Sequence, residues 1–117
     1  MRNAIVDSQF TIIAPSGHIN AANAGLWQHH FQEAVASATT SALLVDMQRV
    51  EYLDSAGLMA LVSALSLSKT LRRRFSICSV APQIRIIFEL TKLDEAFEIF
   101  ENRTAFAATV KDLLSSY

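Results

Sequence analysis

The side chains that could carry chemistry in this 117-residue chain lie mainly in the stretch Asp54-Ser55-Ala56-Gly57-Leu58. Ser55 offers a hydroxyl, and Asp54 offers a carboxylate beside it. Both are also favoured N-cap residues, because their oxygens accept hydrogen bonds from backbone N–H groups that the first turn of a helix leaves unpaired. Spacing alone favours a capping role for this pair over a chemical one.

A hydrolytic serine would need a base and an orienting acid, and the possible bases are His18, His29 and His30. No Gly-x-Ser-x-Gly motif is present. His29 and His30 are neighbours and point about 100° apart on a helix, so they cannot share a metal ion as an i, i+4 pair can. Three glycines are too few for a phosphate-binding loop. We therefore expect no catalytic residue, no metal and no cofactor.

Two other features could indicate chemistry. Asp46 follows an apolar run, as a receiver-type phosphoacceptor would, but that chemistry needs an acidic pair to hold Mg²⁺. The first strand ends in Ala14-Pro15-Ser16 instead. Arg72-Arg73-Arg74 could contact nucleic acid, but cations at a helix C-terminus complement the helix dipole, and no second basic patch follows. We expect neither a phosphoacceptor aspartate nor a nucleic-acid partner.

Length and composition favour one cytoplasmic domain over residues 1–117. Hydrophobic residues make up 51% of the chain, and the net charge of −1 provides no field to attract nucleic acid or an anionic membrane. No signal-peptide pattern is present, and no apolar stretch approaches the ~20 residues that span a bilayer. Cys78 is the only cysteine, which excludes an internal disulfide and favours a buried, inert thiol.

The central motif should begin a helix. Apolar residues recur after it at the i, i+3, i+4, i+7 spacing of one helix face, and Met59 falls instead on a polar stripe with Ser55, Ser63 and Ser66. The buried face is expected to include Leu58, Leu61, Val62, Leu65, Ala60, Ala64, Leu67 and Leu71. Before the motif, residues 41–45 form an apolar run typical of a strand covered on both faces, and residues 47–53 are expected only to connect the two.

Further strands and helices alternate on either side. A strand over residues 9–14 should end at Pro15-Ser16-Gly17, and residues 4–6 could form another. Asn20 is a plausible N-cap of a first helix. Later elements are a strand over 75–80, a helix from Pro82 and a last helix from about Asn102. The expected core comprises Ala24, Trp27, Phe31, Ala34, Val35, Ala38, Ile84, Ile87, Phe88, Phe106, Val110, Leu113 and Leu114, and a short strand holds Phe97, Ile99 and Phe100.

Two segments carry a family resemblance. Leu44-Val45-Asp46 followed by Leu53-Asp54-Ser55-Ala56-Gly57-Leu58 resembles the central motif of STAS domains, in particular bacterial anti-sigma factor antagonists. Residues 79–94 resemble the third helix of that family and the turn after it. The family usually opens with a two-stranded hairpin, whose first strand is short or absent here. Asn20 stands in the loop before the first helix, where the family often has an acidic residue.

The resemblance implies an α/β fold, a single STAS-type domain with a central mixed β-sheet of four or five strands packed against about four helices. It implies a binding module, not an enzyme, that sequesters an anti-sigma factor serine kinase and releases a sigma factor. Ser55 aligns with the phosphorylated serine, and a serine phosphatase would reset it. The implied partner surface comprises His18, Asn20, Asp54, Ser55, Ala56, Gly57, Leu58 and Met59. The domain should be a monomer or weak dimer. A STAS scaffold or ligand-sensing subunit that is never phosphorylated is the alternative.

Overall fold

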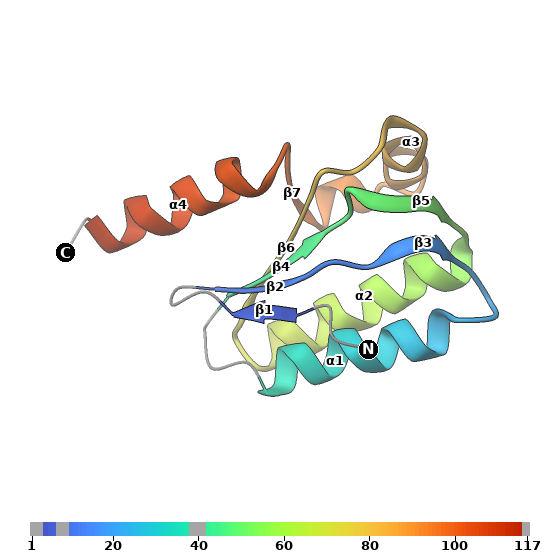
Figure 1. Ribbon diagram of the computed structural model, residues 1–117, viewed down its shortest axis with the longest axis horizontal. Coiled ribbons are helices and arrows are strands. Elements are labelled where there is room, and N and C mark those ends of the chain that lie inside the picture. The colour runs from blue at the N-terminus through green and yellow to red at the C-terminus, as the bar shows by residue number, and fades with distance from the viewer. Residues whose placement is uncertain (1–3, 7–9, 38–41, 116–117) are drawn as a thin grey trace.

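The structure, a computed structural model, describes residues 4–6, 10–37 and 42–115, with side chains over 10–37 and 42–110. Strands and helices alternate along it (Figure 1). The strands are β1 (Ala4–Val6), β2 (Thr11–Ile13), β3 (Ser16–Ile19), β4 (Ala42–Asp46), β5 (Arg49–Leu53), β6 (Arg74–Cys78) and β7 (Glu98–Phe100). The helices are α1 (Ala24–Ser37), α2 (Ser55–Thr70), α3 (Pro82–Leu90) and α4 (Arg103–Ser115), with a 3₁₀ turn at Leu93–Glu95.

The main sheet has five strands in the order β1-β2-β4-β6-β7. β1 and β2 are antiparallel, and the other neighbours are parallel, so the expected mixed sheet is confirmed. The first strand of the hairpin is present but only three residues long. β4 lies in the middle and is buried at every position, as its continuous apolar run predicts.

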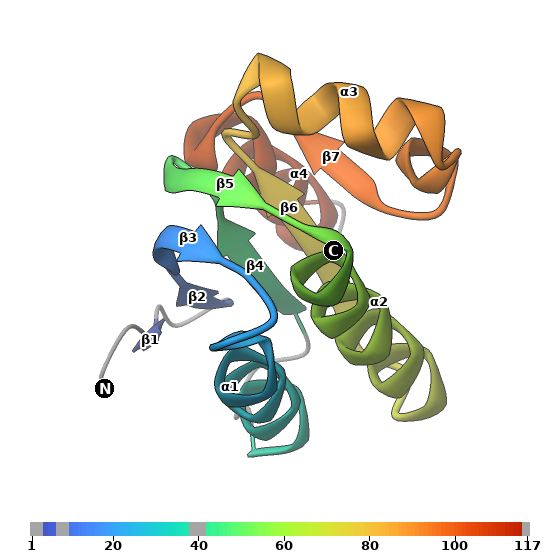
Figure 2. The same ribbon diagram turned by 90° about the vertical axis from the view of Figure 1, so that its right-hand side faces the viewer.

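The two faces of the sheet are covered by different helices (Figures 1 and 2). Leu43 and Val45 point into a core shared with α1, α2 and α3, whereas Ala42 and Leu44 pack with Phe106 of α4 on the other face. This alternation follows from the two-residue period of a strand. The parallel strands therefore carry helices on both faces, and the loops that leave their C-terminal ends lie at one edge of the fold.

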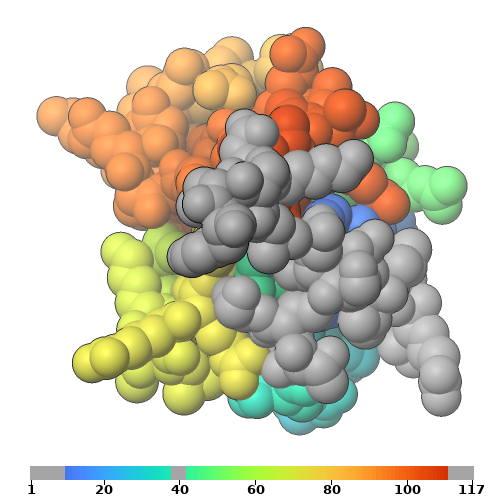
Figure 3. All heavy atoms as spheres, turned by 90° about the vertical axis from the view of Figure 1, so that its left-hand side faces the viewer, coloured from blue at the N-terminus to red at the C-terminus, as the bar shows by residue number. Residues whose placement is uncertain are grey.

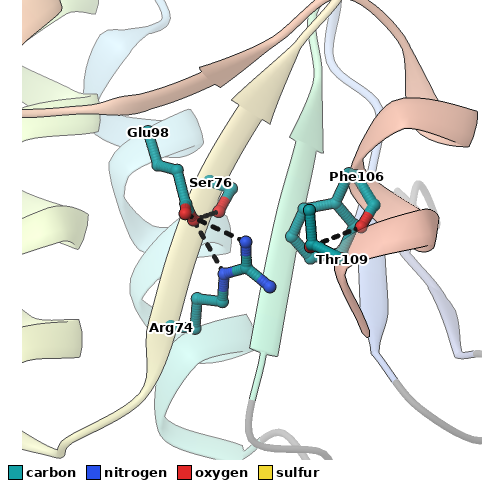
Figure 4. Close-up of polar contacts among 5 residues, drawn as sticks. All are labelled: Arg74, Ser76, Glu98, Phe106 and Thr109. Atoms are coloured by element: carbon teal, nitrogen blue, oxygen red, sulfur yellow. Dashed lines mark hydrogen bonds and ion pairs between the residues drawn. The ribbon is translucent and has the colours of Figure 1, made fainter. Parts of the chain in front are cut away.

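The face covered by α4 holds a polar cluster that the sequence did not reveal (Figure 4). Arg74 lies in β6, not at the end of the preceding helix, and its guanidinium donates two hydrogen bonds to Glu98, of 2.7 and 2.9 Å. Ser76 donates a third. The Arg74 guanidinium also lies 4.7 Å from the Phe106 ring centroid. Its hydrogen bonds hold the pKa of Glu98 below the usual value. The expectation that all three arginines only complement a helix dipole was therefore wrong for Arg74.

Asp46 also has a structural partner. Its side chain is only 4% exposed and forms an ion pair with Arg103 at the start of α4. The other carboxylate oxygen accepts a hydrogen bond from the Gln48 N–H, at 3.0 Å, which turns the chain out of β4. These contacts hold the C-terminal end of β4 against the start of α4. They give the Asp46 carboxylate a structural role.

Two segments expected as turn and connector form a second sheet. β3 pairs in parallel with β5, although Pro15-Ser16-Gly17 was expected to end the strand and residues 47–53 only to connect. Pro15 lacks an N–H and interrupts the ladder of β2, after which the chain continues as β3 in a new direction. Gly17 has φ +76° beside the register shift between Gly17 and His18, a conformation that glycine tolerates best. β5 pairs with a strand more than thirty residues away, so local periodicity could not identify it.

The helix faces follow the predicted periodicity closely. Ala24, Trp27, Phe31 and Val35 are buried in α1, and Leu58, Ala60, Leu61 and Ala64 are buried in α2. Ile84, Phe88, Phe106 and Val110 are buried too. The expectation for Leu71 was wrong, since it is the C-cap residue and 41% exposed. Ala38 and the side chains of Leu113 and Leu114 lie outside the part that the structure describes.

Cys78 provides a first prediction. The side chain is fully buried, and burial raises the pKa of its thiol to about 11 from 9.0. Because the thiolate is the nucleophile, we expect iodoacetamide to alkylate the native protein far more slowly than the urea-unfolded chain at pH 8, as measured by intact mass. The unfolded thiol ionises first, so this group's contribution to stability is complete below pH 9 and is lost as the pH rises toward 11. Equal alkylation rates in both states would contradict the burial.

Candidate functional site

The predicted site lies where α1 and α2 begin, at the end of the molecule that faces the viewer in Figure 2. The opposite end, which Figure 3 shows, carries the last turns of α1 (teal) and α2 (yellow). Two chain segments meet at the site: the connection from β3 to α1 and the connection from β5 to α2. Because β3 and β5 are paired, both connections leave the same small sheet side by side. The second sheet therefore positions the site.

Asp54 is the N-cap of α2. Its backbone is extended, and its Oδ1 accepts a hydrogen bond from the Gly57 N–H at 3.0 Å. The Leu58 N–H donates to the Asp54 carbonyl at 2.9 Å, which closes the first turn. Of the two cap candidates in the sequence, the structure selects Asp54 and leaves the Ser55 hydroxyl out of the cap.

Asp54 also ties α2 to the segment before α1. Its Oδ2 accepts a hydrogen bond from the Ala21 N–H at 3.1 Å, and its own N–H donates to the Ile19 carbonyl at 3.1 Å. One carboxylate thus accepts from two backbone segments that are far apart in sequence. Charge-assisted bonds of this kind are stronger than neutral ones, so Asp54 fixes the relative position of the two connections.

Asn20 organises the other connection. Its Oδ1 accepts from the Ala22 N–H, and Asn23 Oδ1 accepts from the Asn20 N–H, both at 2.9 Å. The second of these bonds is the one that closes a capping box, whereas the Asn20 side chain accepts one residue earlier than in that motif. The regular helix begins only at Ala24, four residues after Asn20. Asn20 therefore caps the turn that leads into α1 and is not the N-cap residue of α1 itself. Asn23 further donates to the His18 carbonyl at 2.8 Å, which links the turn to β3.

Gly57 is required by the close approach of these segments. A Cβ built at this position would lie 2.7 Å from the Ile19 carbonyl oxygen and 2.7 Å from Leu53 Cδ1. Side chains do not tolerate such distances, and the first of these neighbours is backbone that cannot rotate away. The glycine of the motif therefore allows α2 to begin directly against β3.

Ser55 is the first residue of α2, and its side chain is exposed. Its hydroxyl has no hydrogen-bond partner among the residues that the structure describes. The Gly57 N–H already donates its hydrogen bond to Asp54. The Ser55 hydroxyl is therefore not used in capping and lies exposed at the positive end of the helix dipole. This geometry suits a group that another protein modifies or contacts.

The other predicted surface residues divide into two groups. Met59 is 56% exposed, one turn beyond Ser55, as its place on the polar stripe predicts, and His18 is exposed on β3. Ala56 and Asn20 are half-buried. Leu58, only 6% exposed, and Gly57 are buried, so their predicted place on the partner surface is corrected: they support the surface from below.

The sequence interpretation missed Tyr52. It is 50% exposed, and its ring centroid lies 5.8 Å from that of His18, its cross-strand partner. Val50 and Leu53 are buried while Tyr52 points outward, a pattern that becomes readable once residues 49–53 are recognised as a strand. Leu26, near the start of α1, is also 50% exposed. Both add exposed apolar area at the end of the molecule where α1 and α2 begin.

Other kinds of site find no support in the described residues. Within the part of the chain that the structure describes, no three His, Cys, Asp or Glu side chains come together as a metal site would require. Within the same part, no helix has the length and apolar character needed to cross a membrane. His29 is exposed on α1, with its Nε2 3.3 Å from Glu33 Oε2. His30 is half-buried, and its ring lies 5.7 Å from that of Trp27.

Known proteins share this fold. The STAS domain family matches residues 2–105. BtrV of Bordetella bronchiseptica, named as a candidate anti-sigma factor antagonist, is 26% identical over 98 residues, which cover 84% of each chain. TM1081 of Thermotoga maritima, a candidate antagonist of the same kind, has a TM-score of 0.84 at 21% identity over 92% of each chain.

A third neighbour is the anti-sigma factor antagonist SpoIIAA of Bacillus. Its unphosphorylated form has a TM-score of 0.67 over 92% of each chain, and its phosphorylated form has one of 0.69 over 91% of this chain and 95% of its own, both at 13% identity. The family match covers most of the sequence, including both connections that build the site, and the fold agrees with that of these neighbours. The chain therefore belongs to the STAS domain family.

Proposed function

We propose that this protein is an anti-sigma factor antagonist whose unphosphorylated form binds an anti-sigma factor serine kinase and so frees a sigma factor. The observation that carries this proposal is Ser55, an exposed hydroxyl at the first position of α2 whose capping role Asp54 has taken. The resemblance of the motif to the phosphorylated segment of the family and the names of BtrV and SpoIIAA support it. The chain acts by binding and is not itself a catalyst.

The switch is electrostatic and steric. A phosphoryl group on Ser55 adds about −1.5 to −2 charges and three acceptor oxygens. The domain tolerates this charge because backbone N–H groups and the helix dipole favour an anion at a helix N-terminus. Asp54 lies beside it, so the surface becomes strongly anionic. A partner surface that fits a small hydroxyl then meets repulsion and loses contact, and a serine phosphatase restores the binding form.

The direct test is to detect the covalent modification of the protein. The protein is co-expressed with the serine kinases of its host, and the intact mass is measured before and after treatment with a serine phosphatase. We expect one phosphoryl group, located on Ser55 by peptide mapping, and recovery of kinase binding after its removal. An unmodified mass under conditions where the kinases are active would instead favour a STAS scaffold or ligand-sensing subunit that is never phosphorylated.

Met59 supplies a prediction about the same surface. Since its side chain is exposed, Met59→Ala should leave the free energy of unfolding nearly unchanged but weaken kinase binding by ~1 kcal/mol or more if it is an anchor. The matched control is Met47→Ala, the same change at a methionine that is fully buried, which should cost about 2–5 kcal/mol of stability. Thermal unfolding and a binding titration check both variants. A loss of stability in Met59→Ala as large as in Met47→Ala would disprove its surface role.

A further inference from the structure

The outer side of α3 is unusually apolar for a surface helix and is not part of the site described above. Ile84 and Phe88 anchor the inner side of this nine-residue helix and are 1% and 0% exposed. Ile86 and Leu90, one turn apart on the outer side, are 53% and 80% exposed. Leu90 is the most exposed large apolar side chain of the described residues. In both views α3 lies at the margin of the fold (Figures 1 and 2).

Charged residues run alongside this apolar stripe. Arg85 and Glu89 are also one turn apart, are exposed, and occupy the row next to Ile86 and Leu90. Among the residues that the structure describes, neither forms an ion pair, although their i, i+4 spacing would allow one. The pair has the order Arg then Glu, which is the less favourable order within a helix. Both charges are therefore available to another chain.

This pattern is complementary to itself. When two copies of α3 pack antiparallel about a two-fold axis that passes beside residue 87, each Arg85 meets Glu89 of the other copy, and each Glu89 meets Arg85. The same axis places Ile86 against its own counterpart and toward Leu90 of the other copy. A two-fold interface requires such reciprocal contacts, in which residue i meets j and j meets i. A parallel two-fold arrangement would instead place the charged rows of the two copies on opposite sides of the apolar stripe, so the charges would not meet.

We propose that the outer face of α3, formed by Arg85, Ile86, Glu89 and Leu90, binds a second copy of this chain in an antiparallel, two-fold symmetric contact. The helix is about 13 Å long, so the contact is small and the dimer weak, populated at high micromolar to millimolar protein concentration. The proposal does not rest on the proposed function, because both the contact and its test involve this chain alone.

The test is a charge exchange measured by sedimentation equilibrium of the full chain. Arg85→Glu and Glu89→Arg each turn both attractive pairs into repulsive ones and should each weaken self-association by about tenfold or more. An equimolar mixture of the two variants should associate again, as a heterodimer, because every pair is then opposite in charge. The double variant Arg85→Glu/Glu89→Arg should associate like the unmodified protein. Leu90→Ser should abolish association without lowering the melting temperature.

Three outcomes would overturn the proposal. The first is a monomeric unmodified protein at millimolar concentration. The second is a mixture of the two charge variants that associates no better than either alone, which would exclude the antiparallel pairing. The third is unchanged self-association in Leu90→Ser, which would show that the exposed apolar side chain of α3 takes no part in the contact. Loss of the Ser55 switch would not affect any of these results.

Discussion

Phosphorylation of Ser55 is expected to lower the affinity of this protein for its kinase partner by about a hundredfold or more, without unfolding the domain. Like charges brought together at an interface cost several kcal/mol, and Asp54 already places one carboxylate at the site. Ser55→Asp should reproduce only part of the loss, because a carboxylate carries one charge and lacks the third oxygen of a phosphate. Isothermal titration of the three forms measures the difference.

Ser55→Ala should bind constitutively and remain unmodified. Its cost in stability should be small, because Asp54 and not Ser55 caps the helix. Ser66→Asp is the matched control: Ser66 is exposed on the same helix, about 16 Å further along, and the change should leave binding intact. A phosphoryl group mapped to Ser63 or Ser66, or a Ser55→Asp protein that binds as tightly as the unmodified one, would overturn the assignment.

Gly57→Ala is expected to destabilise the fold by about 1–3 kcal/mol, although alanine is the better helix former. The added methyl group would lie 2.7 Å from the Ile19 carbonyl oxygen, so either α2 or β3 must move. Movement there also strains the hydrogen bonds that Asp54 makes to Ala21 and Ile19. We therefore expect a lower melting temperature and, from the displaced helix start, weaker kinase binding.

Gly25→Ala provides the matched control for this prediction. Gly25 lies in α1, and apart from its chain neighbours and the adjacent helix backbone no atom lies within 4 Å of the position that a Cβ would take. The same substitution should therefore stabilise the protein, by up to about 1 kcal/mol, through helix propensity alone. Urea unfolding of both variants gives the two free energies. A Gly57→Ala protein as stable as Gly25→Ala would show that the close approach to β3 does not constrain the site.

The sequence by itself determined the elements whose signals are local. The i, i+3, i+4, i+7 spacing after Ser55 identified α2 and placed Met59 on its exposed side, because helix geometry relates position in sequence directly to face. The apolar run of β4 predicted a strand buried on both faces for a similar reason. The motif at residues 53–58 identified the family, which in turn implied the mixed sheet.

Only the tertiary structure decided how the site is assembled. Three contacts that build the fold and the site join residues more than twenty positions apart. They are the pairing of β3 with β5, the hydrogen bond from the Ala21 N–H to Asp54, and the ion pair of Arg74 with Glu98. Periodicity reports on neighbours along one element and carries no information about which distant segment supplies the partner. The role of Gly57 illustrates this limit: the restriction on that residue comes from the carbonyl group of Ile19, on another strand.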